Sequence, residues 1–107
     1  MADYWSQNDF RSNANASVTQ APPAPTSSVR LRAIQLSGSG AIQILDGDAV
    51  IWVIELQSES FSASSLDIRA SPGNAMTVQF TAPPPDGDTA VNVQGDFCAA
   101  DSGYGLE

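Results

Sequence analysis

Acidic side chains beside glycine are the first candidates for chemistry in this sequence of 107 residues. Two Asp-Gly-Asp triplets, at residues 46–48 and 86–88, each place a pair of carboxylates close together, and calcium prefers such oxygen ligands. Neither triplet is followed by the regularly spaced acidic ligands that complete a calcium loop. Asp and Gly are also common turn residues. We therefore predict a turn at each triplet, with a calcium ion bridging loops as the alternative, and we predict no cofactor and no metal site.

Nucleophilic catalysis lacks its usual partners in this sequence. The chain has one cysteine, Cys98, and no histidine, so neither a thiol with an imidazole base nor a Ser-His-Asp triad can be assembled. A metal site of the Cys/His type is excluded for the same reason. Cys98 is interpreted as a small buried hydrophobic residue, with a reactive thiol and an intermolecular disulfide as the alternatives. We predict that the protein is not an enzyme.

The charge of the chain excludes several classes of partner. There are 12 acidic and 4 basic residues, giving a net charge of -8, and the basic residues, all arginines, form no cluster along the sequence. Nucleic-acid binding normally needs a basic stripe, and an anionic membrane surface would repel the chain, so neither is a predicted partner. The longest apolar run is far too short to span a membrane, and residues 1–6 lack the features of a signal peptide, which predicts synthesis in a cytoplasm. Three arginines on outward strand positions are expected to form cross-strand ion pairs, or else to contact an acidic partner surface. The expected pairs join Arg30, Arg32 and Arg69 to Asp67 or Glu55.

The strongest structural signal is the stretch 46–56, in which an Asp-Gly turn precedes the longest apolar run. Its β-branched and aromatic residues predict a central β-strand entered from a hairpin turn. Alternate side chains of a strand point to opposite faces, and here both faces are largely apolar. A small sheet can bury one face in its own core, whereas the other needs a second sheet, an arm of the chain or a neighbouring molecule. One face would carry Val50, Trp52, Ile54 and Leu56, and the other Ala49, Ile51, Val53 and Glu55.

Short strands are predicted through most of residues 29–97, where no helical period of useful length occurs. Their alternation changes phase near Ala33 and Ile34, which predicts a bulge there. A serine-rich loop at 57–65 and a Pro-rich connection at 82–88 would separate the later strands. The pattern predicts an all-β domain, a β-sandwich or jelly-roll-like barrel of about six to eight strands, followed by an acidic C-terminal tail at 98–107.

Residues 1–28 are polar and small and end in a Pro-rich segment, which predicts an extended, flexible N-terminal arm. Its large side chains near the free end are Tyr4, Trp5 and Phe10. Aromatic residues dominate interface hot spots, so we expect these three to anchor the arm on a partner surface. The alternative is a short tail folded back over the exposed face of its own sheet.

The order of elements between Val29 and Phe97 resembles that of small β-sandwich virion proteins of tailed bacteriophages. The family comprises capsid decoration, or cement, proteins and related head or tail accessory proteins. The resemblance implies an all-β subunit, often a trimer or dimer, that binds the outer face of the major capsid protein. The Pro-rich N-terminal segment departs from the compact members of the family. The matching features are the opening strand from Val29, a Ser/Gly turn, a short strand ending in Asp46-Gly47, an apolar strand, a strand at Leu66-Asp67-Ile68, a Pro72-Gly73 turn and a final strand.

The resemblance thus implies a non-enzymatic structural protein of the virion, placed on the capsid surface after synthesis in the host cytoplasm. Its expected partners are the major capsid protein and further copies of itself. The alternative is a carbohydrate- or receptor-binding module of a phage tail or fibre, which would use the loop aromatics Phe61 and Tyr104. On the first hypothesis the partner-interface residues are Tyr4, Trp5 and Phe10 of the arm and Ile51 and Val53 of the central strand.

Overall fold

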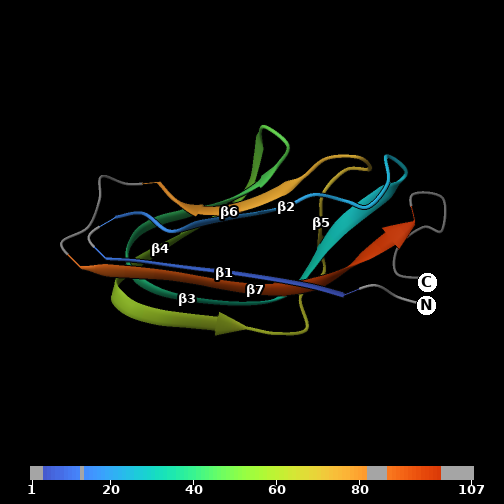
Figure 1. Ribbon diagram of the computed structural model, residues 1–107. Helices are drawn as coiled ribbons and strands as arrows, with labels where there is room; N and C mark the ends of the chain where they lie inside the picture. Colours follow the sequence, from blue (N-terminus) through green and yellow to red (C-terminus); the bar gives the residue numbers. More distant parts are fainter. Residues whose placement is uncertain (1–3, 13, 82–86, 100–107) are drawn as a thin grey trace.

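The computed structural model describes residues 4–12, 14–81 and 87–99, which are built from β-strands (Figure 1). Within these residues there is no helix, and the strands join into one antiparallel sheet that folds over itself as a sandwich. The all-β fold predicted from the sequence is confirmed. The strands are β1 (Tyr4–Ser12), β2 (Ser17–Gln20), β3 (Ser27–Asp46), β4 (Ala49–Ala63), β5 (Ile68–Arg69), β6 (Met76–Phe80) and β7 (Asp88–Ala99).

β3 is the central strand and belongs to both layers of the sandwich. Residues 27–37 pair with β7 and, towards their end, with the end of β4, whereas residues 40–46 pair with β4 and β6. Between these halves the register shifts at Gly38 and Gly40, whose φ angles of 128° and 126° favour glycine. A second register shift, between Leu31 and Ala33, lies beside the predicted bulge. We call the two layers the β7 layer (β1, β7, the first half of β3 and the end of β4) and the β6 layer (β2, β6, the second half of β3 and the start of β4).

β4 lies at the edge of the sheet, so the prediction of a central strand at 46–56 is wrong. A two-residue turn at Gly47 and Asp48 brings β4 back alongside β3, and among the described residues β3 is the only strand that pairs with β4. The other side of β3 is occupied by β6 and β7. The predicted hairpin itself is confirmed, since Asp46 pairs with Ala49 and Gly47 has a φ of 61°. β4 also continues to Ala63, through most of the segment predicted as a serine-rich loop.

Two stretches of the predicted N-terminal arm, residues 4–12 and 17–20, belong to the sheet, so an arm separate from the β domain is not confirmed. β1 pairs with β7, from Tyr4 opposite Asp96 to Ser12 opposite Asp88, and β2 pairs with β6. A strand with one solvated face can carry small polar residues on that side while a single apolar side chain such as Trp5 faces the core. The Pro-rich segment connects β2 to β3.

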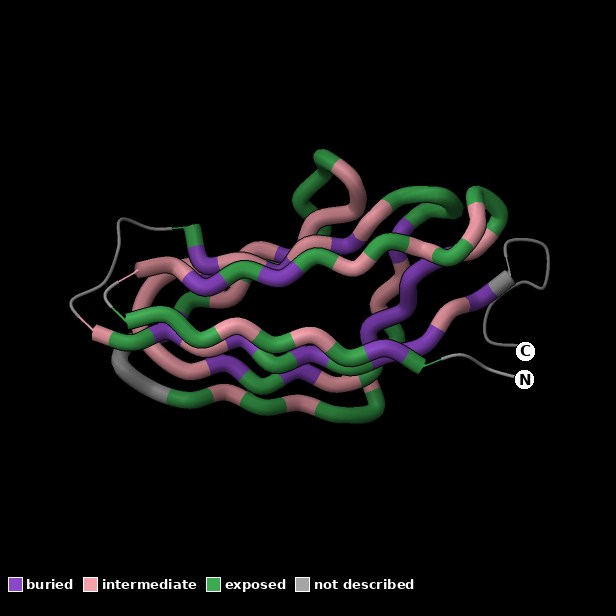
Figure 2. The backbone as a smooth tube through the Cα atoms, in the orientation of Figure 1, coloured by how far each residue is buried: buried purple, intermediate pink, exposed green. Residues whose placement is uncertain are grey.

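The hydrophobic core fills the space between the two layers, and Figure 2 shows buried positions alternating with exposed ones along the strands. Trp5 takes part in this core, and its indole Nε1 donates a hydrogen bond to the backbone carbonyl oxygen of Asp96 at 3.0 Å. Cys98 is buried, as predicted, whereas residues 100–107 of the predicted tail lie outside the described residues. The other large core side chains include Val29, Leu31, Ile34, Leu36, Ile42, Ile44, Met76, Val78, Phe80, Val91 and Val93.

The carboxylate of Asp46 holds the first Asp-Gly-Asp turn in place. It accepts hydrogen bonds from the backbone N–H of Ser71 at 3.0 Å, from the Ser71 hydroxyl at 2.8 Å and from the side-chain amide of Asn74 at 2.9 Å. These bonds tie the β3–β4 hairpin to the loop before β6, so the turn predicted at 46–48 is confirmed. In the part of the chain that the structure describes, no three His, Cys, Asp or Glu side chains gather as a metal site.

These bonds make the contribution of Asp46 to stability depend on pH. Burial raises the pKa of its carboxyl, but the hydrogen bonds from Asn74 and Ser71 outweigh this effect and the pKa is lowered. A carboxyl with a lowered pKa in the folded state adds stability above its unfolded pKa, and that stability is lost as the pH falls through the folded pKa. We expect Asp46→Asn to reduce the free energy of unfolding at about pH 7 and to have little effect at about pH 2. Urea unfolding at both pH values tests this, and an equal loss at the two would contradict it.

Candidate interaction surfaces

Three apolar side chains of β4 stand out from the surface of the β6 layer. Val50 is 47% exposed, Ile51 41% and Val53 53%. We call these three residues the β4 surface. Residues 49–54 carry no charged side chain, although the whole chain has a net charge of -8. The two residues predicted to face outward, Ile51 and Val53, are therefore exposed, and their role in an interface stays a prediction.

A bulge explains why Val50 joins this surface, against the prediction that it shares a face with Trp52. Trp52 pairs with Ile44 and Val50 pairs with Leu45, so Ile51 is an extra residue on the β4 side of the ladder. The alternation of faces is reset at that point. Trp52 itself is partly buried, and its ring meets that of Phe61 edge to face, with centroids 6.5 Å apart.

The aromatic residues predicted to act as binding anchors are divided among different environments. Trp5 is only 8% exposed and belongs to the core, whereas Tyr4 is 80% and Phe10 63% exposed on β1. Phe61, predicted to be a loop aromatic, is part of β4 and packs against the core. Tyr104 lies outside the described residues. The three predicted arm anchors thus do not form one docking element.

Three arginines that are separate in the sequence come together around two carboxylates. Arg30 is buried and donates two hydrogen bonds to Asp96, from Nε at 2.6 Å and from a terminal nitrogen at 2.8 Å. Arg32 lies 3.7 Å from the same carboxylate. Arg69, opposite Arg30 in the sheet, pairs with Asp67 at 2.8 Å, and this hydrogen bond lowers the pKa of the Asp67 carboxyl.

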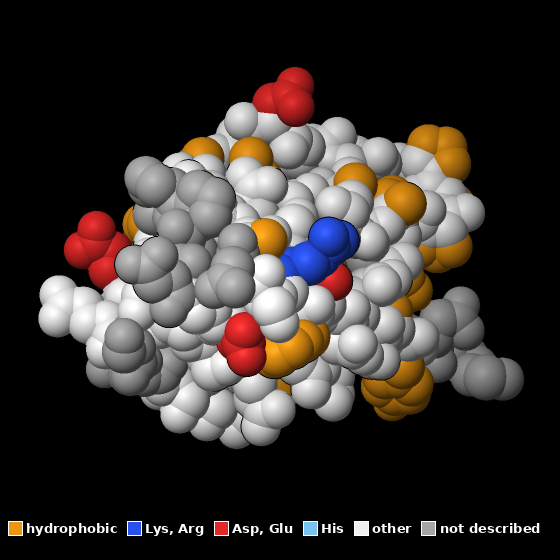
Figure 3. All heavy atoms as spheres, turned by 60° about the vertical axis from the view of Figure 1, so that its left-hand side comes forward, with side chains coloured by type: hydrophobic (Ala, Val, Ile, Leu, Met, Phe, Trp, Pro, Cys, Tyr) orange, Lys and Arg blue, Asp and Glu red, His pale blue; other side chains and the backbone are white. Residues whose placement is uncertain are grey.

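Asp67 does form an ion pair, with Arg69, but the two lie in one segment and not on facing strands as predicted. The cross-strand partner of Arg30 is Asp96, which sequence reasoning missed. Asp96 meets Arg30 because β7 runs antiparallel to β3, a pairing that no local pattern reveals. The two carboxylates neutralise most of the positive charge of the three arginines. We therefore interpret the cluster as a set of ion pairs that stabilises the fold and not as a binding site for an acidic partner. In the face of the molecule shown in Figure 3, charged side chains are few and hydrophobic ones form several small patches.

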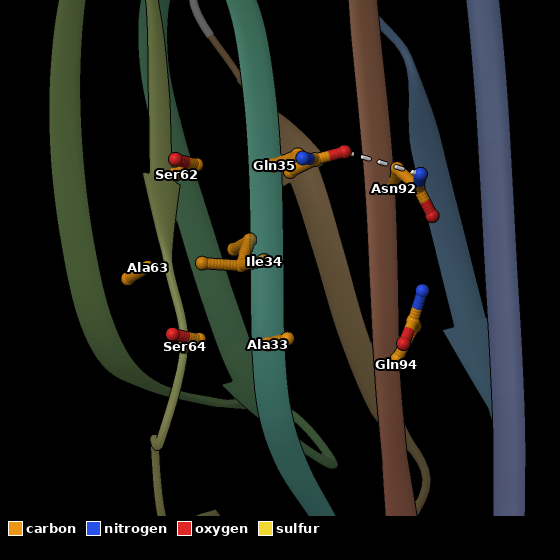
Figure 4. A pocket seen from close by; sticks show the side chains of 8 residues that line it. All are labelled: Ala33, Ile34, Gln35, Ser62, Ala63, Ser64, Asn92 and Gln94. Atoms are coloured by element: carbon orange, nitrogen blue, oxygen red, sulfur yellow. Dashed lines mark hydrogen bonds between the residues drawn. The ribbon is translucent and has the colours of Figure 1, made fainter.

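A polar hollow lies on the outer side of the β7 layer, across β4, β3 and β7 (Figure 4). Its volume is about 370 Å³, and a second hollow of about 420 Å³ continues it, since both share Gln35, Ser62 and Asn92. In the sheet Gln35 lies between the other two, opposite each of them. The Asn92 amide donates to the Gln35 side-chain oxygen at 3.4 Å. Sequence reasoning missed this site because outward polar residues on strands are usually only a solvated face. The first hollow is lined by Ala33, Ile34, Gln35, Ser62, Ala63, Ser64, Asn92 and Gln94.

Comparison with protein-family models, with curated proteins and with solved structures found no match for this chain. None of the described residues forms a helix that could cross a membrane. Function is therefore inferred from two surfaces of the molecule. One is an apolar stretch at a sheet edge, and the other is an uncharged polar hollow on the opposite layer.

Proposed function

We propose that this protein is a non-enzymatic structural subunit that docks on other protein subunits through the β4 surface. The observation that carries the proposal is the combination of three exposed branched side chains with an edge strand that has no charge over residues 49–54. Natural edge strands are commonly protected by charged residues or by proline, and β4 has neither in this stretch. An apolar patch of this kind is typical of a protein contact.

The bulge at Ile51 favours contact through side chains over addition of a partner strand. A bulge interrupts the regular ladder of outward N–H and C=O groups, so another strand would not pair evenly along this edge. The side chains of the β4 surface remain available to enter a pocket on the partner. Docking would also stabilise a small domain, because any partner that binds only the folded state shifts the folding equilibrium.

The place we propose for this subunit is the outer face of a tailed-bacteriophage capsid, where it would act as a decoration protein on the major capsid protein. The support is the resemblance in the order of strands and turns to virion proteins of that kind, together with the docking surface. Self-association as a dimer or trimer would use the same β4 surface or an adjacent part of the sheet. The proposed location is the capsid surface of a virion assembled in a host cytoplasm.

Replacing Ile51 and Val53 together by serine is expected to weaken binding to capsids at least about tenfold, because two central apolar contacts would be lost. Co-sedimentation with purified capsids that lack the protein measures this binding, and light scattering of the free protein measures its mass. The serine variant should keep its circular dichroism spectrum, since both side chains are exposed.

Phe10→Ser provides the matched control, because it also replaces an exposed apolar side chain but lies on the β7 layer. It is expected to leave capsid binding unchanged. Full occupancy of capsids by the Ile51/Val53 variant would refute the docking role of the β4 surface.

A further inference from the structure

We propose that the outer side of the β7 layer binds a neutral polysaccharide chain in the polar hollow. This inference concerns the opposite layer from the β4 surface and goes beyond the proposed docking function. A subunit attached by one layer would present the other to its surroundings. Three features of this layer favour such a ligand: the polar lining of the hollow, its lack of charge and the two exposed aromatic residues beside it.

The hollow is lined by amide and hydroxyl groups that both donate and accept hydrogen bonds. A cross-strand row runs from Asn8 on β1 through Asn92 and Gln35 to Ser62 on β4. Gln94 lies two residues further along β7, and Figure 4 shows Ser62, Gln35, Asn92 and Gln94 distributed over adjacent strands. Sugar hydroxyls need partners of both kinds, and primary amides supply a donor and an acceptor in one plane. The lining thus matches the chemistry of a polyol.

The amide groups retain hydrogen-bonding capacity for a ligand. The hydrogen bond between Asn92 and Gln35 is 3.4 Å long, near the limit for such a bond, whereas each primary amide offers two donors and an acceptor. Small side chains at Ala33, Ser62 and Ser64 make the hollow, since longer residues at these outward positions would fill it. The hollow therefore offers both room for a ligand and polar groups whose hydrogen-bonding capacity is not fully used.

Among the lining residues that the structure describes, none in either hollow is charged, although the chain has a net charge of -8. A phosphate, a nucleic acid or a basic peptide would find no ion pair there. A neutral ligand avoids the free-energy cost of burying a charge that has no ion-pair partner in the hollow. The lack of charge thus favours a neutral sugar chain over the charged classes of ligand.

Two exposed aromatic residues lie at the ends of β1 beside this face. Alternation along β1 places Trp5 in the core and Tyr4 and Phe10 on the outer side, and Phe10 lies opposite Ala90, which lines the second hollow. Phe10 follows Tyr4 by six positions, so the two places on the strand are about 20 Å apart. Aromatic faces pack against the apolar faces of sugar rings, as they do in other ligand sites. The spacing suits an extended chain, with amides between two stacking positions.

Affinity electrophoresis tests the proposal directly. Native gels that contain dextran, mannan, galactomannan, xyloglucan or mixed-linkage β-glucan would be run beside gels without polysaccharide. We expect at least one of these neutral polymers to retard the wild-type protein. Asn92→Ala and Gln94→Ala should each weaken that retardation at least about fivefold, because each removes a hydrogen-bonding amide.

Gln79→Ala is the matched control, because it removes an amide from a strand of the β6 layer. It should bind like the wild type, and Phe10→Ala should bind more weakly. Since no ion pair is involved, retardation should not change between about 50 and 500 mM NaCl. The proposal is overturned if none of the neutral polymers retards the protein, if Gln79→Ala loses as much as Asn92→Ala, or if only the acidic polymer alginate binds.

Discussion

Replacing Gly95 by alanine is expected to abolish stable folding. Gly95 lies opposite Trp5 in the sheet, and the indole ring crosses directly over it. A Cβ atom at this position would overlap the backbone oxygen of Arg30 and would stand 2.7 Å and 2.8 Å from two carbons of the Trp5 ring. Neither neighbour can yield easily, because one is backbone of the central strand and the other is a large buried ring. We expect a loss of more than about 5 kcal/mol, which is as large as the whole free energy of unfolding of a marginally stable domain.

Gly87→Ala is the control, since a Cβ atom there meets no other atom within 4 Å. Thermal unfolding followed by circular dichroism compares the two variants with the wild type. Gly87→Ala should unfold close to the wild-type temperature, whereas Gly95→Ala should lack a cooperative transition. A stable, cooperatively folded Gly95→Ala variant would show that β1 can move away from β7 without loss of the fold.

The second large effect is expected at the buried ion pair of Arg30 and Asp96. Both side chains are about one tenth exposed, and the two hydrogen bonds between them are 2.6 and 2.8 Å long. Asp96→Ala would leave the guanidinium of Arg30 buried without this carboxylate. Breaking a buried pair from one side costs about 3–5 kcal/mol. We expect a loss of that size in the free energy of unfolding, measured by urea titration.

Two further variants test whether the loss of stability in Asp96→Ala comes from the buried, unpaired charge of Arg30. The pair of Arg69 and Asp67 has the same chemistry, but its carboxylate is 56% exposed, so Asp67→Ala is expected to cost less than about 1 kcal/mol because water screens that charge. The double replacement of Arg30 by Met and Asp96 by Leu should recover much of the stability lost in Asp96→Ala, since no unpaired charge remains. If Asp67→Ala costs as much as Asp96→Ala, burial does not explain the effect.

Local sequence signals predicted the elements whose own residues determine them. In β6, Met76, Val78 and Phe80 alternate with polar residues, which is the pattern of a half-buried strand, and all three are buried. The hairpin at Asp46-Gly47 follows from turn chemistry, and the bulge near Ala33 follows from the change of phase. In each case the physical cause acts within a few residues, so the pattern in the chain is sufficient.

Features that depend on distant pairing could not be predicted in the same way. The sequence predicts a flexible arm at residues 1–28 because most of their side chains are small and polar, yet pairing with β7 and burial of Trp5 fix β1 in the sheet. The stretch 46–56 is predicted to contain a central strand because its apolar run has two largely apolar faces. Hydrophobicity does not specify which strand lies beside which, and the chain places β4 at the edge.

The candidate sites show the same difference between features that neighbouring residues determine and features that depend on distant pairing. Exposure of Ile51 and Val53 was predicted from strand alternation, whereas Val50 joined them through a bulge that only the register reveals. The polar hollow requires three strands to lie side by side, with Asn92 reaching Gln35 across them. Amides at these positions carry no distinctive local signal, so the site emerges from the three-dimensional arrangement alone.

The pairing of β1 with β7 has a consequence for synthesis of the protein. At roughly 5 to 20 residues per second, a ribosome needs several seconds to make the segment between these strands. During that time the nascent chain has no β7 to pair with β1, and Trp5 has no carbonyl of Asp96 to receive its hydrogen bond. Among the described strands, β1 thus leaves the exit tunnel first but is among the last to be secured, and the emergence of β7, more than local propensity, sets the moment at which the sandwich closes.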